Sequence, residues 1–350
     1  MTRSLALPPA PASAPSAVRR PRRTRWLALG VIAVLVAVAV ALSVCIGGRP
    51  STLAEAWHAM VTPTGTVMDV TIRELRWPRT VTAVVVGVCL GVAGVLVQGH
   101  TRNPIADPGL LGINQGAALA IVAVTAMVGT VAPLTQALLA FAGALVAVVV
   151  VFLIGSAARH GATPITLVLA GAAVSAMCTG LVSGIVLLND QALDTLRFWQ
   201  VGSVAIRNGS LEILAPFLAL GLVLAVLNIG ALNALSLGED TARSLGVSVL
   251  RARVSGIAAI TLLAGAAVTL AGPIAFAGLL VPHLARAMVG TDYRWLLPAG
   301  ALAGATLLLL ADTAGRIIAR PGELSVGVVL AAVGAPFFIH LARRKKLATV

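Results

Sequence analysis

The stretch Arg76-Trp77-Pro78-Arg79, the uncharged run after it, and the turn Asn103-Pro104-Ile105-Ala106-Asp107-Pro108-Gly109-Leu110-Leu111-Gly112 decide the fold. Residues 80–97 carry no charge and consist mostly of Val, Ala and Gly. Such a run suits lipid, because only its ends hold groups that need water. Two prolines four residues apart cannot lie inside a regular helix, and neighbouring glycines add backbone freedom. We therefore expect a membrane span followed by a shaped cytoplasmic turn built from Asn103, Pro104, Asp107, Pro108 and Gly109.

The composition places the whole chain in the membrane class. Of its 350 residues, 59% are hydrophobic and 11% charged, and the mean hydropathy is +1.00. Soluble domains are closer to a quarter charged. The 35 glycines fit close helix packing in lipid. For Gly87, Gly91 and Gly94 we expect either helix packing or a place along a transport pathway.

Further uncharged runs predict the other membrane spans. They are residues 26–46, 110–132, 134–158, 163–188, 213–235, 254–281, 296–311 and 324–342. The run 254–281 is longer than the about 20 residues that a span needs, and it contains Gly272-Pro273. Together with residues 80–97, the runs give nine spans, or ten if the long run breaks at Gly272-Pro273. A signal peptide is the alternative for residues 26–46, but no small-x-small cleavage site supports it.

The positive charge decides the span count. The net charge is +13, but it lies in the tails and connections and not in a basic domain, so it indicates topology and no nucleic-acid partner. Both tails are basic, and basic flanks stay in the cytoplasm. Two cytoplasmic termini require an even number of spans. We predict an all-α polytopic membrane protein with ten transmembrane helices, made of residues 1–25 as a disordered basic tail, 26–342 as the membrane domain and 343–350 as a second basic tail.

No pattern for catalysis or for a cofactor is present. The only lysines are Lys345 and Lys346, so the chain lacks a phosphate-binding loop and cannot itself hydrolyse ATP by that motif. Its five histidines and three cysteines show no metal-ligand spacing. The predicted spans place no carboxylate near mid-membrane, where an ion-coupled transporter would use one.

One cytoplasmic connection has a helical pattern of its own. Ser236-x-x-Glu239 matches a capping box, and Gly246 is a natural helix stop. Asp240, Arg243 and Leu245 lie between them. The segment is either a solvated connector or a peg that docks into a soluble partner. Thr52-x-x-Glu55 predicts a similarly capped helix on the outer side, and Asp312 and Arg316 have the spacing of a helical ion pair.

Four blocks of residues resemble one known family, the permease subunits of bacterial ABC importers for iron–siderophore complexes, haem and vitamin B12 (FecCD type). The blocks follow one another in the order of the chain. They are residues 76–99, residues 101–118, residues 237–246, and residues 272–283 with Ala311-Asp312, Glu323-Leu324 and Gly334–Phe338.

The resemblance implies ten helices in each of two permease subunits, identical or similar. It further implies two cytoplasmic ATP-binding subunits, an external substrate-binding lipoprotein or periplasmic protein, and a bacterial plasma membrane. The segment 236–246 would be the ATPase-coupling helix. Arg76, Arg79 and Arg316 match arginines that meet acidic residues of the binding protein; the alternative is anchoring at lipid headgroups.

The same resemblance makes a ferric siderophore the commonest cargo and leaves haem and cobalamin open. An ion-coupled secondary transporter is the competing class of protein. The capped cytoplasmic helix and the lack of mid-span charges favour the ABC importer.

Overall fold

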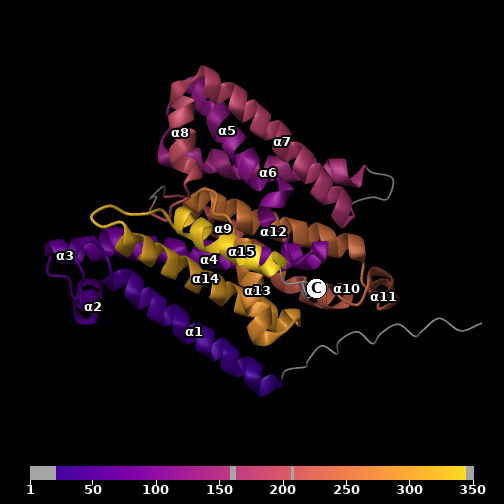
Figure 1. Ribbon diagram of the computed structural model, residues 1–350, viewed down its shortest axis with the longest axis horizontal. Helices are drawn as coiled ribbons and strands as arrows, with labels where there is room; N and C mark the ends of the chain where they lie inside the picture. Colours follow the sequence, from indigo (N-terminus) through magenta and orange to yellow (C-terminus); the bar gives the residue numbers. More distant parts are fainter. Residues whose placement is uncertain (1–20, 158–162, 206–208, 344–350) are drawn as a thin grey trace, which may run out of the picture.

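The computed structural model describes residues 21–157, 163–205 and 209–343, and within these ranges every regular element is a helix. Figure 1 shows most of the long helices, such as α1 (Arg22–Cys45), α12 (Val249–Ala271) and α14 (Tyr293–Ile318), running side by side along the long axis. The start of α1, the short α11 (Glu239–Ser244) and the end of α15 (Val326–Arg343) lie at one end of the long axis. The short helices α2 (Leu53–Val61) and α3 (Val67–Val70) lie at the other end. The basic flanks mark the first end as cytoplasmic.

Seven helices in the described chain are long and apolar enough to cross a membrane. They are α1, α4 (Trp77–Thr101, continuous with α3 and the π-helical turn Thr71–Arg76), α6 (Pro133–Ser156), α7 (Pro164–Leu188), α9 (Ser210–Leu227), α12 (Val249–Ala271) and α14 (Tyr293–Ile318). Three shorter apolar helices complete the set: α5 (Ile113–Val128), α13 (Ala277–Val289) and α15. The polytopic all-α prediction is confirmed, with ten apolar helices of which three are short.

The predicted break at Gly272-Pro273 is present. Helix α12 ends at Ala271, and Gly272 has a φ of +72°, a left-handed value that favours glycine. Ser203 then donates its backbone N–H to the carbonyl of Ala271 at 2.7 Å, which satisfies one of the carbonyls that a helix end leaves free. The chain resumes as α13 at Ala277.

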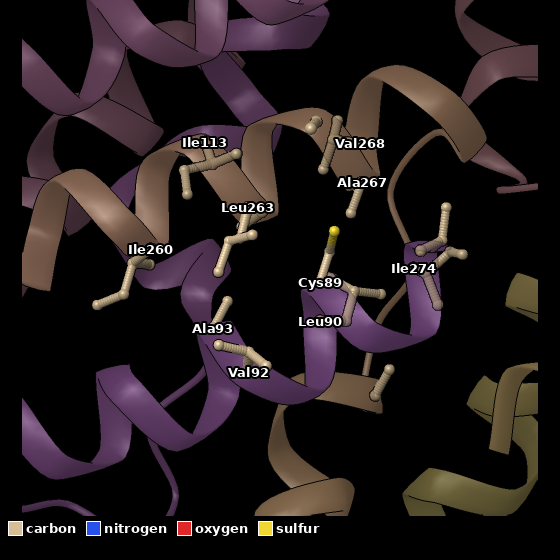
Figure 2. Packing of buried hydrophobic residues seen from close by; sticks show 14 of the residues in the cluster. Cys89, Leu90, Val92, Ala93, Ile113, Ile260, Leu263, Ala267, Val268 and Ile274 are labelled. Atoms are coloured by element: carbon tan, nitrogen blue, oxygen red, sulfur yellow. The ribbon is translucent and has the colours of Figure 1, made fainter. Parts of the chain in front are cut away.

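Helix α4 runs through the centre of the bundle, and residues 91–100 of it are all buried. In Figure 2, Cys89 and Leu90 of α4 lie opposite Ala267 and Val268 of α12. The three glycines of α4 let other helices approach this closely. A Cβ on Gly87 would meet the backbone of residues 304–305, one on Gly91 the carbonyl of Gly300, and one on Gly94 the carbonyl of Gly278. These glycines therefore contact helix backbones, which is a packing role.

The first helix begins earlier than expected. We predicted a disordered tail that extends to Arg25. Helix α1 instead starts at Arg22, so residues 22–25 are helical. Residues 1–20 and 344–350 of the two tails lie outside the described residues. At the outer end, Thr52 and Glu55 form the predicted capping box at the start of α2. The hydrogen bonds from Thr52 lower the pKa of the Glu55 carboxyl below its usual value.

Candidate functional site

The proline turn after α4 folds back into the bundle. Helix α4 continues to Thr101, four residues beyond the uncharged run 80–97 that predicted this span. The side chain of Gln98, buried in α4, donates to the backbone carbonyls of Ala106 at 3.3 Å and Leu279 at 3.4 Å. The turn is thus held against the helix it has just left.

The second half of the turn lies at membrane depth and not at the cytoplasmic surface. A Cβ on Gly171 would collide with the carbonyl of Leu110, and Gly171 is seven residues, or about 10 Å, from the cytoplasmic start of α7. Asp107 caps the 3₁₀ turn Pro108–Leu111 by accepting from the N–H of Gly109 at 2.8 Å. Irregular backbone at membrane depth is tolerated only inside protein or beside a cavity. The turn therefore re-enters the membrane, which explains why α5 has only 16 residues.

At the outer end, Arg76, Arg79 and Arg316 meet in the wall of one cavity of 410 Å³. Arg49 and Glu323 also line this external arginine cavity, and both are exposed. The three predicted arginines come from α4, the turn before it and α14, and their separation in sequence hides this convergence.

Two of these arginines are turned inward. Arg76 is 6% exposed and Arg316 is 3% exposed. Arg76 donates to the carbonyls of Val44 at 2.9 Å and Cys45 at 3.1 Å, and Arg316 donates to those of Ser43 at 2.8 Å and Ile46 at 2.7 Å. The last carbonyls of a helix have no partner within the helix. The two guanidinium groups supply those partners and fix the outer end of α1.

Arg79 holds a buried ion pair. Its Nε and Nη2 donate to Asp312 of α14 at 3.0 and 2.8 Å, and its Nη1 donates to Glu323 at 2.5 Å. Arg316 also pairs with Asp312, at 3.1 Å, which confirms the predicted ion pair on α14. A bidentate arginine–carboxylate contact is among the stronger protein hydrogen bonds. The sequence missed the link from Arg79 to Asp312 because the residues lie 233 positions apart.

At the cytoplasmic end, α11 has only six residues, and it does not begin as predicted. Glu239 is the first helical residue and Gly238 precedes it as the N-cap, with no side-chain capping bond. The hydroxyl of Ser236 instead donates to the carbonyl of Asn233 at 2.7 Å. The capping box assigned to Ser236 and Glu239 is therefore wrong, because α10 (Ile229–Leu235) extends almost to that serine.

The predicted helix stop is where the sequence placed it. Gly246 has a φ of +82°, and its N–H donates to the carbonyl of Arg243 at 2.9 Å. The N–H of Val247 donates to the carbonyl of Ala242 at 3.0 Å. This is the pattern of a glycine-terminated helix end.

One face of α11 is anchored and the other is free. Ala242 is fully buried in a small cluster with Leu235, Val249 and other residues of α10 and α12. Glu239 accepts a hydrogen bond from Arg253 of α12, a partner that sequence reasoning did not identify. The side chain of Asp240 is fully exposed. Exposed leucines surround the helix: Leu237, Leu245 and Leu250, at 65%, 63% and 62%.

Helix α10, against which α11 packs, is hydrogen-bonded to the start of α14, and the same aspartate there is bonded to α1. Asn233 of α10 donates to Asp292 at 3.0 Å and accepts from the N–H of Tyr293 at 3.0 Å. Arg25 of α1 donates to the same Asp292 at 3.4 Å. A displacement of α11 would therefore reach α12 through Arg253, and α1 and α14 through Asn233.

The described residues contain no group of three or more His, Cys, Asp or Glu side chains that could hold a metal ion. The described residues offer two surfaces for partners: a basic cavity on the outside and an exposed helix on the inside.

Comparison with known proteins agrees with this arrangement. A family model described as the FecCD transport family matches residues 35–344. The chain is 46% identical over 324 residues to the ferric enterobactin transport system permease protein FepD of Escherichia coli (strain K12), covering 92% of this chain and 96% of that protein. It is 39% identical over 308 residues to the iron(3+)-hydroxamate import system permease protein FhuB of Bacillus subtilis (strain 168), covering 87% and 80%.

A solved structure has the same architecture. It is an inward-facing conformation of a metal-chelate type ABC transporter, with a TM-score of 0.72 and 27% sequence identity, covering 91% of this chain and 99% of that one. With a family model across most of its length and relatives of this similarity, the chain belongs to the FecCD transport family and is a multi-pass permease subunit of an ABC importer in the inner membrane.

Proposed function

We propose that this permease carries ferric siderophore complexes across the plasma membrane. The observation that carries the proposal is the 46% identity to a ferric enterobactin permease over nearly the whole of both chains. A second relative named for ferric hydroxamate import supports the same cargo class. Haem and cobalamin are the alternative cargoes, because members of this family share one fold and the binding protein contributes much of the discrimination.

Two separate ATP-binding subunits drive the cycle in this proposal, and α11 is the element that they contact. The exposed leucines next to α11, which are Leu237, Leu245 and Leu250, and the exposed carboxylate of Asp240 suit a protein surface, since buried apolar anchors with a polar rim are typical of interfaces. The contacts of Glu239 with Arg253 and of Asn233 with Asp292 would carry a push on α11 into three spans. Rigid-body shifts of that kind switch transporters between two openings.

An external binding protein delivers the cargo at the arginine cavity. Four arginines and one glutamate line it, so the cavity carries excess positive charge even after Arg79 is paired. Arg76 and Arg316 act on a partner through this field and not by direct contact, because their donors already bind carbonyls of α1. Exposed Arg49 at the rim is the residue placed to touch an acidic side chain.

A second permease subunit, identical or similar, completes the pathway. The exposed face of α7 suits it, because Gly180 and Gly184 lie four residues apart and a Cβ on either would meet no atom within 4 Å. Small residues at this spacing let two membrane helices approach closely.

The test is uptake by the reconstituted complex. Proteoliposomes containing the permease, its ATP-binding subunits and its binding protein are supplied with radiolabelled ferric enterobactin, a ferric hydroxamate, haem or cobalamin. We expect a ferric siderophore to accumulate in the reconstituted vesicles. Accumulation should require the binding protein on the side from which the cargo is taken up, and ATP on the opposite side. Accumulation of haem or cobalamin alone would replace the cargo and leave the permease assignment intact.

A further inference from the structure

Two adjoining cavities follow α12 from its cytoplasmic end into the membrane. The first measures 840 Å³ and lies between the start of α12, the end of α9 and α10. The second, of 310 Å³, is a groove between α12 and α6 whose walls are almost wholly apolar. Val254 and Ala258 of α12 line both cavities, so the two meet along one stripe of that helix.

Except for Thr261 in the deeper groove, the polar groups of this double cavity lie at its cytoplasmic end. Arg251, Ser248 and Ser255 line the cytoplasmic part, whereas the α6 side presents Leu145, Val148, Val149, Phe152 and Leu153. Arg251 is exposed and makes no ion pair with any residue that the structure describes. Among the described residues that line the two cavities, none is a carboxylate. The charge at the mouth is therefore positive and uncompensated.

The length of the stripe matches one leaflet. Arg251, Val254, Ala258 and Leu262 lie three or four residues apart and so share one face of α12. From Arg251 to Leu262 the helix rises about 16 Å at ~1.5 Å per residue. That is roughly half of the ~30 Å hydrocarbon thickness of a bilayer. A cationic group at the interface with a leaflet-deep apolar groove below it is the shape of a phospholipid site.

We propose that this surface binds one anionic phospholipid of the cytoplasmic leaflet. Its phosphate lies at Arg251, one acyl chain lies in the groove between α6 and α12, and the other lies between α12 and the end of α9. The site adjoins Gly246 and Val247 at the end of α11. The lipid therefore fills the space beside the coupling helix where α12 enters the membrane.

Native mass spectrometry of the purified transporter complex tests this, with titration of phosphatidylglycerol or the zwitterionic phosphatidylethanolamine. An arginine near an anionic bilayer surface contributes a factor of roughly five in affinity. We expect Arg251→Gln to lower phosphatidylglycerol binding about fivefold and phosphatidylethanolamine binding by less, because the ammonium group of the zwitterionic lipid already offsets its phosphate charge. Ala258→Trp places a large side chain where the two cavities meet and should lower binding of both lipids. Arg294→Gln, which removes another exposed cytoplasmic arginine that lines neither cavity, should change neither.

Three results would overturn the proposal. One is equal phosphatidylglycerol binding by wild type and Arg251→Gln. Another is no preference of the wild type for the anionic lipid. The third is loss of the ATP-binding subunits from the Arg251→Gln complex with unchanged lipid binding, because the cavity would then receive a side chain of that partner. If Ala258→Trp fails to assemble, the comparison of Arg251→Gln with Arg294→Gln alone tests the lipid site.

Discussion

Arg316→Gln should destabilise the permease before it affects any partner. The side chain of Arg316 is almost wholly buried and donates to two carbonyls of α1 as well as to the hydroxyl of Ser43. It also pairs with Asp312. Glutamine is too short to reach the end of α1 and carries no charge.

The size of the effect follows from what remains after the change. Breaking a buried ion pair by removing one partner costs about 3–5 kcal/mol. Asp312 keeps its bidentate contact with Arg79, so we expect the lower part of that range, about 3 kcal/mol. Each kcal/mol lowers the midpoint by about 2 °C in larger domains, so the melting temperature should fall by roughly 6 °C.

The buried thiols provide the assay. Cys89 and Cys178 are 2% and 4% exposed, so a fluorogenic thiol reagent reports their exposure on heating in detergent. Arg320→Gln is the matched control, because Arg320 is an exposed arginine on the same side with one hydrogen bond, to Gly47 at 3.2 Å. It should melt within about 1 °C of wild type, as surface changes usually cost under 0.5 kcal/mol. If Arg316→Gln melted like Arg320→Gln but lost affinity for the binding protein, Arg316 would serve docking and not the stability of the fold.

Three further predictions concern helix packing, the end of α11 and the membrane topology. Gly91→Ala places a Cβ against the carbonyl of Gly300 and should cost about 1–3 kcal/mol by overpacking, whereas Gly30→Ala on α1 has open space and should be silent in the same melting assay. Gly246→Val puts a β-branched residue at a φ of +82°; it should lower co-purification of the ATP-binding subunits while insertion persists, and the control Gly209→Val, at a φ of +66° on the outer side, should retain them. Cysteines at Ser13 and Thr349 should both be protected from an impermeant thiol reagent in intact cells, and external labelling of either would contradict two cytoplasmic termini.

The features predicted correctly from sequence are those with local causes. The break at Gly272 and the stop at Gly246 both rest on a backbone conformation that glycine adopts with least strain, and the cap at Thr52 depends on a residue three positions away. The all-α, multi-pass class of the protein followed from the length of its hydrophobic runs. Such signals need no knowledge of the neighbouring helices.

The features that were missed depend on packing between distant segments. The inward fold of the turn at Asp107 requires Gln98 and Gly171 as its contacts. The pairing of Arg79 with Asp312 joins two spans far apart in sequence. The capping box predicted at Ser236 is the converse case. The local sequence pattern is present, but the hydroxyl of Ser236 donates to the carbonyl of Asn233 at the end of the preceding helix instead.

We propose that ATP-binding subunits act on this permease through contact with α11. The most direct measurement places a photo-crosslinking amino acid at Leu245, beside the exposed end of α11, and at the exposed Arg294, at the cytoplasmic start of α14, as a control. We predict that the assembled transporter forms a covalent adduct between the Leu245 variant and an ATP-binding subunit, with a yield that changes when ATP is added. An adduct from Arg294 but none from Leu245 would contradict the assignment of α11 as the coupling helix.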